Sequence, residues 1–151
     1  MLRKALTPGK VHPTRDNVYI DTSFFIATQT ANHPRHSRAV AILESCKKWR
    51  LFFSLLTIDE IMYTLLQFNL SRNRINTIIR DKILSIHNVH LITYPPDLKS
   101  IEKYLTIWGM TGLAPRDALH LYLMRTKKIQ YLATFDLDFK RNQHKLGISV
   151  L

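Results

Sequence analysis

Residues 18–25 read VYIDTSFF, in which a short apolar run is followed by Asp21 and then by a second apolar run. Residues 18–20 favour a β-strand, and Asp21 and Thr22 are residue types that begin helices. We therefore predict a strand, a turn and a helix, with Asp21 at the carboxyl end of the first strand. Ligands bind at that edge of an open α/β sheet. Taken alone, however, an aspartate in this position indicates a helix cap.

The rest of the chain alternates between strand-like and helix-like segments. Short apolar runs typical of strands lie at residues 51–55, 89–93, 130–134 and 148–151. Apolar residues at helical spacing lie at 33–50, 58–70, 71–86, 98–108 and 114–124, and a last short helix or turn begins near Asp138. Such alternation predicts an α/β fold with a parallel sheet and helices on both faces.

Length and charge restrict the function. The chain has 151 residues, which suits one domain with a single core. It carries 22 Lys and Arg against 11 Asp and Glu, a formal charge of +11. Such an imbalance attracts polyanions, and nucleic acid is the first partner to expect. Any single basic cluster, such as Lys47, Lys48 and Arg50, is also typical of a solvated helix face.

Cysteine content and hydropathy bear on the compartment. Cys46 is the only cysteine, so no internal disulfide and no thiolate zinc site can form, and we expect a cytoplasmic protein. The longest nearly apolar run, residues 51–58, is too short to span a bilayer, which needs about 20 residues. Residues 1–16 are basic, contain two prolines and lack the apolar core of a secretory signal. They predict a flexible tail before one domain at residues 17–151.

Four acidic residues follow predicted strands or begin predicted helices: Asp21, Glu60, Asp117 and Asp136. Thr57 is predicted to cap one of these helices, with Glu60 three residues later in its first turn. Each acid alone is typical of a cap or of a favourable interaction with a helix dipole. Four at one edge would raise one another's pKa and destabilise the fold unless a cation lies among them. Oxygen ligands suit Mg²⁺ or Mn²⁺, so we predict a site for one of these metals.

The histidines favour no zinc site. His33 and His36 have a possible i, i+3 spacing, but the chain has no HExxH motif and no cysteine partner for them. His120 would share a helix face with Asp117, where it either lines the site or packs in the core.

At the four acids the chain resembles a PIN-domain nuclease, close to the VapC-type ribonuclease toxins of prokaryotic toxin–antitoxin pairs. The resemblance runs from about Asn17 to Leu151. The motifs that carry it are IDTSFF with Asp21, TIDEIMY with Glu60, APRDALHLYL with Asp117 and LATFDLDF with Asp136. It implies a three-layer α/β/α sandwich with a central parallel sheet, and metal-dependent cleavage of single-stranded or structured RNA. It also implies a cognate antitoxin protein and a homodimer.

The resemblance assigns roles to the four acids, which would hold one or two metal ions. Asp21 and Asp117 would be direct ligands, Glu60 a ligand or a base that orients water, and Asp136 a ligand of a second metal. The alternative to Glu60 is its neighbour Asp59, which would point about 100° away around the helix axis.

Four further residues match positions near the acids. Asp138 either contacts metal through water or starts the last helix. Thr22 and Thr134 match hydroxyl positions that flank the metal site, although capping a helix and ending a strand explain them equally well. Arg116 either holds a substrate phosphate or pairs with a nearby acid.

Two other classes of function remain open. A catalytically inert PIN-like RNA-binding module would bind RNA in a salt-dependent way, without any need for Mg²⁺. A receiver-like signalling domain would need a pair of early acids and a late strand-end lysine, positions that Asp16 and Lys140 fit poorly.

Overall fold

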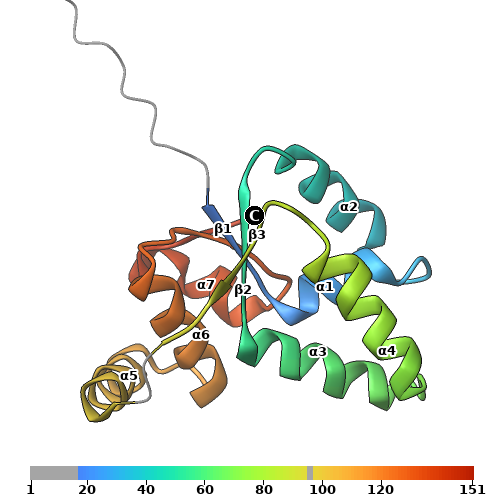
Figure 1. The fold of residues 1–151 in the computed structure, drawn as a ribbon. Helices are drawn as coiled ribbons and strands as arrows, with labels where there is room; N and C mark the ends of the chain where they lie inside the picture. Colours follow the sequence, from blue (N-terminus) through green and yellow to red (C-terminus); the bar gives the residue numbers. More distant parts are fainter. Residues whose placement is uncertain (1–16, 95–96) are drawn as a thin grey trace, which may run out of the picture.

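The computed structural model describes residues 17–94 and 97–151 (Figure 1). The strands are β1 (Asn17–Ile20), β2 (Arg50–Ser54), β3 (Val89–Ile92), β4 (Tyr131–Ala133) and β5 (Ser149–Val150). The helices are α1 (Thr22–Gln29), α2 (His36–Ser45), α3 (Leu55–Gln67), α4 (Arg72–Ile79), α5 (Leu98–Thr111), α6 (Pro115–Thr126) and α7 (Leu137–Leu146), with a π-helical turn η1 (Arg80–Leu84) after α4. The predicted tail, residues 1–16, lies outside the described residues.

The five strands form one parallel sheet in the order β3-β2-β1-β4-β5. From β1 the chain adds strands first on one side and then on the other, so the order reverses between β1 and β4. In open α/β sheets the crevice at such a reversal, beyond the carboxyl ends of the strands, is where ligands bind. Asp21 follows β1 and Asp136 follows β4, so both acids lie beside this crevice.

Helices cover both faces of the sheet, which confirms the predicted three-layer α/β/α architecture (Figure 1). Side chains alternate along β1 between the two faces. Val18 and Ile20 pack in a core shared with α1, α3 and α4. Tyr19 packs in a second core, with Leu121 of α6 and Phe139 of α7. No helix in the described part of the chain is long and apolar enough to cross a membrane.

The predicted start of α3 is wrong. The helix begins at Leu55 with Ser54 as its N-cap, because the buried Ser54 Oγ accepts the backbone N–H of Thr57 at 3.1 Å. Thr57 therefore lies inside the first turn, and Glu60 falls in the second turn instead of the first. The last predicted short helix is a full helix, α7, which ends at Gly147 in the left-handed conformation that glycine tolerates.

A candidate metal centre at the carboxyl edge of the sheet

The four predicted acids line one open pocket at the carboxyl edge of the sheet. Asp21 follows β1, Glu60 comes from the second turn of α3, Asp117 from the first turn of α6, and Asp136 from the end of the loop after β4. The structure thus brings together acids from four separate segments of the chain. That they bind metal or take part in catalysis remains a prediction.

Asp21 fills the N-cap position of α1, but its side chain makes no capping hydrogen bond. Its Oδ2 instead accepts hydrogen bonds from Ser23 Oγ and Thr134 Oγ1, each at 2.7 Å. The side chain is buried, with 8% of the residue's surface exposed. Oδ1 lies 3.9 Å from His120 Nε2. Two hydroxyls therefore hold one carboxylate oxygen.

Ser23 was not among the site residues predicted from the sequence, although it directly follows Thr22 in the same motif. The two hydroxyls serve different acids, because Thr22 Oγ1 donates to Glu60 Oε2 at 2.8 Å while Ser23 reaches Asp21. Local spacing does not reveal this division of contacts, since Glu60 comes from another helix.

Glu60 is held by His120 as well as by Thr22. His120 Nε2 lies 3.0 Å from Glu60 Oε2. Burial opposes ionisation of Glu60, but the hydrogen bond and charge of His120 and the hydrogen bond of Thr22 outweigh it, so the pKa of Glu60 is lowered. An ionised carboxylate only accepts hydrogen bonds, so Nε2 of His120 carries the proton in this contact.

The other ring nitrogen of His120 faces a buried phenol. Nδ1 lies 2.7 Å from Tyr19 Oη, which also lies 2.6 Å from Ser54 Oγ and 3.0 Å from Thr57 Oγ1. Burial raises the pKa of Tyr19, so the phenol keeps its proton in this contact. The sequence left open whether His120 packs or lines the site. It does both, because it is buried and its Nε2 reaches an acid.

Asp117 shows that negative charge accumulates in the pocket. Burial, followed by the charge of Asp136, raises the pKa of Asp117 to about 6, and Asp21 and Glu60 contribute in the same direction. Asp136 itself caps α7, since its Oδ1 accepts the backbone N–H of Asp138 at 2.7 Å. A divalent cation among these carboxylates would remove the repulsion that raises the pKa.

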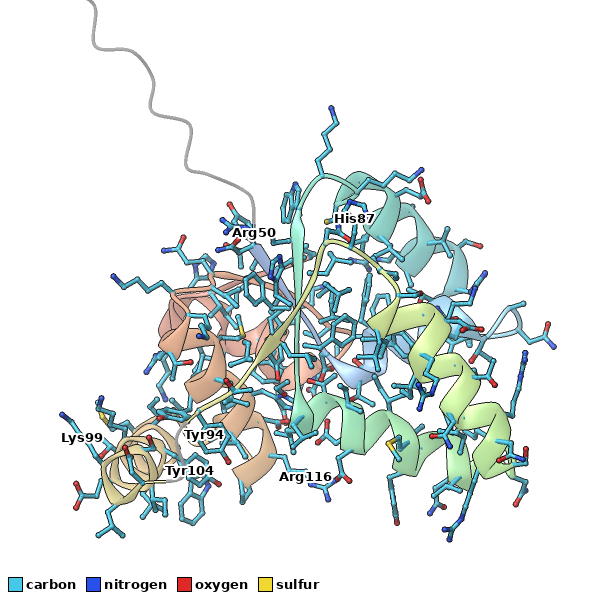
Figure 2. All side chains as sticks on the ribbon, in the orientation of Figure 1. Arg50, His87, Tyr94, Lys99, Tyr104 and Arg116 are labelled. Atoms are coloured by element: carbon cyan, nitrogen blue, oxygen red, sulfur yellow. The ribbon has the colours of Figure 1, made fainter. Side chains whose placement is uncertain are left out.

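Three other predicted residues lie at or beyond the rim. Asp138 is exposed in the first turn of α7 and does not line the pocket, which favours the alternative that it starts the helix. Arg116 is exposed, with Nη1 3.9 Å from Glu60 Oε1, and Figure 2 shows it at the end of the sheet opposite Arg50. Asp59 is exposed and lines a different, apolar groove.

The donor set fits a hard divalent cation. Ligand atoms of Asp21, Glu60 and His120 lie within 4.8 Å of one another, and Asp117 and Asp136 line the same pocket. Because Nε2 of His120 is engaged by Glu60, the free donors are carboxylate oxygens, the ligands that Mg²⁺ and Mn²⁺ prefer. His36 Nδ1 contacts the Ala27 carbonyl oxygen at 2.8 Å, and the backbone N–H of Arg35 donates to His33 Nδ1 at 3.1 Å.

The family model described as the PIN domain matches residues 18–145. The chain belongs to the PIN domain family. This confirms the family that the sequence motifs indicated. The match spans the pocket-lining acids Asp21, Glu60, Asp117 and Asp136. No curated protein matches this PIN domain.

Solved structures with a similar fold include VapC20, FitAcB and VapBC2. VapC20 of Mycobacterium tuberculosis has a TM-score of 0.63 and 23% identity, covering 82% of this chain and 93% of its own. FitAcB of Neisseria gonorrhoeae has a TM-score of 0.63 and 15% identity, and the match covers 89% of this chain and 96% of the FitAcB chain. VapBC2 of Rickettsia felis has a TM-score of 0.60 and 16% identity, and the match covers 89% of this chain and 97% of the matched VapBC2 chain. At these identities the likeness establishes a shared PIN fold.

Proposed function

We propose that this PIN domain is a metal-dependent endoribonuclease that hydrolyses phosphodiester bonds of single-stranded or structured RNA. The observation that carries the proposal is the pocket in which Asp21, Glu60, Asp117 and Asp136 converge, within a chain of formal charge +11. Acids that hold a metal and a surface that attracts polyanions are the two requirements of such an enzyme.

The four acids would hold Mg²⁺ or Mn²⁺, with Asp21 and Asp117 as direct ligands and Asp136 as the ligand of a second ion. When bound, such an ion activates water and neutralises the charge that develops on the leaving oxygen. We assign Glu60 as a ligand or as the base that orients water, and Asp138, which lies outside the pocket, to the start of α7. Thr22, Thr134 and Arg116 would contact substrate.

The hydrogen bonds of the pocket support these roles. Ser23 and Thr134 bind one oxygen of Asp21, which leaves the other available to a ligand. Thr22 and His120 hold Glu60 in its ionised form. Side chains fixed in this way lose little freedom when a ligand binds, so the site is preorganised. Thr22 and Thr134 thus orient acids in addition to any contact with substrate.

We further propose that the protein is the cytoplasmic toxin of a toxin–antitoxin pair. VapC20 is described as a toxin that cleaves the sarcin–ricin loop, and VapBC2 as bound to a DNA fragment of its promoter. A cognate antitoxin would dock on the apolar side chains that α3 exposes, Met62, Tyr63 and Leu66. A homodimer would use the exposed apolar face of α5.

The decisive experiment is cleavage of single-stranded and structured RNA with Mg²⁺, Mn²⁺ or EDTA. Cleavage is expected with either metal and not with EDTA. Asp21→Asn should reduce the rate at least about 100-fold, because it removes a direct ligand while keeping the shape of the side chain. The matched control is Asp59→Asn, which removes an exposed acid outside the pocket and should cleave like the parent.

The outcome separates two functions. If Asp21→Asn cleaves RNA as fast as the parent, the site assignment is wrong. Salt-dependent RNA binding without cleavage in any metal would identify the inert binding module instead.

A further inference from the structure

A second groove, which we call the basic groove, opens beside the acidic pocket. It is lined by Arg35, Arg38 and Lys140. It shares Arg35, Phe135 and Asp136 with the acidic pocket, so the two form one continuous depression. A polyanion that reached the acids would therefore lie against these three cations.

The basic groove is assembled from segments far apart in the sequence. Arg35 is the N-cap residue of α2, Arg38 lies in the first turn of that helix, and Lys140 belongs to α7. A solvated helix face needs no such convergence, because it arises from one helix. The fold brings these cations to the edge that carries the acids.

The two arginines are held in place by Phe135. Arg35 Nη1 donates to the Phe135 carbonyl oxygen at 2.8 Å. The guanidinium carbons of Arg35 and Arg38 lie 5.1 Å and 5.9 Å from the centroid of the Phe135 ring, within the range of cation–π attraction. The same ring stacks on Phe24 with centroids 5.6 Å apart, which anchors it to the core.

These cations have no acidic partners. Within residues 17–94 and 97–151, no carboxylate lies within 4.0 Å of the charged atoms of Arg35, Arg38 or Lys140. Lys47 and Arg116, by contrast, have Glu44 and Glu60 as partners. Among the described residues, the basic groove therefore presents three cations without close acidic partners, with Asp136 as its one lining acidic side chain, beside a pocket that by itself repels phosphate.

We propose that the basic groove binds the backbone phosphates of RNA next to the scissile phosphate. This inference rests on the proposed ribonuclease function and adds the path of the strand. Guanidinium groups suit phosphate oxygens because their planar donors form paired, charge-assisted hydrogen bonds. Lys140 supplies a point charge to a neighbouring phosphate. Contacts of this kind position the backbone and do not read sequence.

The test is the salt dependence of binding to a fluorescent single-stranded RNA, measured by anisotropy in EDTA so that no cleavage occurs. The test variant is Arg38→Gln with Lys140→Gln. Arg35 is kept because it bonds to the backbone of Phe135. The matched control is Arg50→Gln with Lys127→Gln, which removes the same charge at the opposite end of the sheet, where Figure 2 shows Arg50.

The expected result is a change of slope. For single-stranded RNA, each phosphate contact contributes about 0.7 to the magnitude of the slope of log affinity against log salt concentration. The test variant loses two contacts, so the magnitude of its slope should be smaller than the parent's by about 1.4. Its affinity near 0.1 M salt should fall at least about 10-fold, while the control keeps its slope and loses less than about 3-fold. Equal weakening of RNA binding in both variants would overturn the proposal. An acidic peptide that binds the parent through Arg38 and Lys140 but does not displace the RNA would also overturn it.

The inference and the nuclease proposal fail separately. A parent that cleaves RNA while the test variant binds and cleaves normally would refute the basic groove alone. A parent whose RNA binding depends on Arg38 and Lys140 but which never cleaves RNA would refute the nuclease alone. Thermal unfolding of each variant checks that lost binding does not reflect lost structure.

Discussion

Asp21 occupies a helix N-cap position with its backbone while its carboxylate turns to Ser23 and Thr134. The N–H groups that begin α1 therefore do not compete for that carboxylate. Glu60 is likewise bound by Thr22 and His120, and His120 by Tyr19. At the scale of single residues, hydroxyl and imidazole groups orient Asp21 and Glu60, and each contact can be removed separately.

The pH dependence of stability tests the charge balance of the pocket. The pKa of Asp117 is raised to about 6, against about 4 in an unfolded chain. The stability that its protonated form contributes is complete below about pH 4 and is lost as the pH rises through about 6. Asn does not ionise, so Asp117→Asn does not lose stability as the pH rises. In EDTA at pH 8 its free energy of unfolding should exceed that of the parent by about 1 kcal/mol, a value that allows for solvent screening of a half-buried group.

Urea unfolding at pH 4.5 and pH 8 measures this difference, which should shrink at the lower pH. Asp138→Asn is the control, since Asp138 is exposed outside the pocket and its replacement should bring no gain at pH 8. A parent as stable as Asp117→Asn at pH 8 would show that neither burial nor the neighbouring acids disfavour the ionised form of Asp117. Saturating Mg²⁺ should stabilise the parent more than the variant.

Tyr19→Phe tests the buried phenol. The variant leaves Nδ1 of His120 without its partner, while the hydroxyls of Ser54 and Thr57 still bond to each other, and an unsatisfied buried polar group costs about 1 to 3 kcal/mol. The free energy of unfolding in urea should fall by that amount. Tyr104→Phe, which removes an exposed hydroxyl bonded to the Pro115 carbonyl, should change it by less than about 0.5 kcal/mol.

At the scale of elements, the start of α3 decides which acid faces the site. Each residue turns a helix by about 100°, so Glu60 lines the pocket while its neighbour Asp59 lines another groove. The N-cap, Ser54, joins this helix to β1 through the hydroxyl of Tyr19. The orientation of Glu60 thus depends on a strand-end contact that lies outside the helix.

Ser54→Ala should therefore destabilise the protein more than removal of an ordinary cap. Loss of an N-cap costs about 1 kcal/mol, and Tyr19 would lose a buried partner as well, so a total of about 2 kcal/mol is expected. The control is Ser71→Ala, which removes the exposed N-cap of α4 and should lower the free energy of unfolding by about 1 kcal/mol or less. Equal losses in thermal or urea unfolding would contradict a coupling of the cap to the site.

At the scale of the whole molecule, an acidic pocket and a basic groove adjoin at one edge of the sheet. The acids surround the strand-order reversal between β1 and β4, and the basic groove adjoins them. Besides the residues that they bury, α3 and α5 carry exposed apolar side chains, which are Met62, Tyr63 and Leu66 on α3 and Leu98, Ile101, Leu105 and Trp108 on α5. The proposed RNA strand and the proposed protein partners would therefore use distinct surfaces.

The exposed face of α5 gives a prediction on assembly. Leu98, Ile101, Leu105 and Trp108 follow helical spacing, and 80%, 49%, 48% and 44% of their surfaces are exposed. Ile101→Glu with Leu105→Glu should convert the proposed dimer into monomers, because burying unpaired charge is costly. Sedimentation equilibrium measures the mass. Leu84→Glu, on η1, is the control and should stay dimeric, and an unchanged mass in the α5 variant would exclude this face.

The alternation of strands and helices is predictable from the sequence, because the periodicity of apolar residues is local. The meeting of four acids is predictable as well, because Asp21 and Asp136 follow parallel strands, whose carboxyl ends share an edge, and Glu60 and Asp117 lie near the starts of helices that face it. The N-cap of α3, the partner of Ser23 and the place of His120 between Tyr19 and Glu60 are set by tertiary packing. The contact from Tyr19 to Ser54 spans 35 positions and that from Thr134 to Asp21 spans 113. Contacts between residues so far apart arise when sheet and helices pack, and local spacing does not encode them.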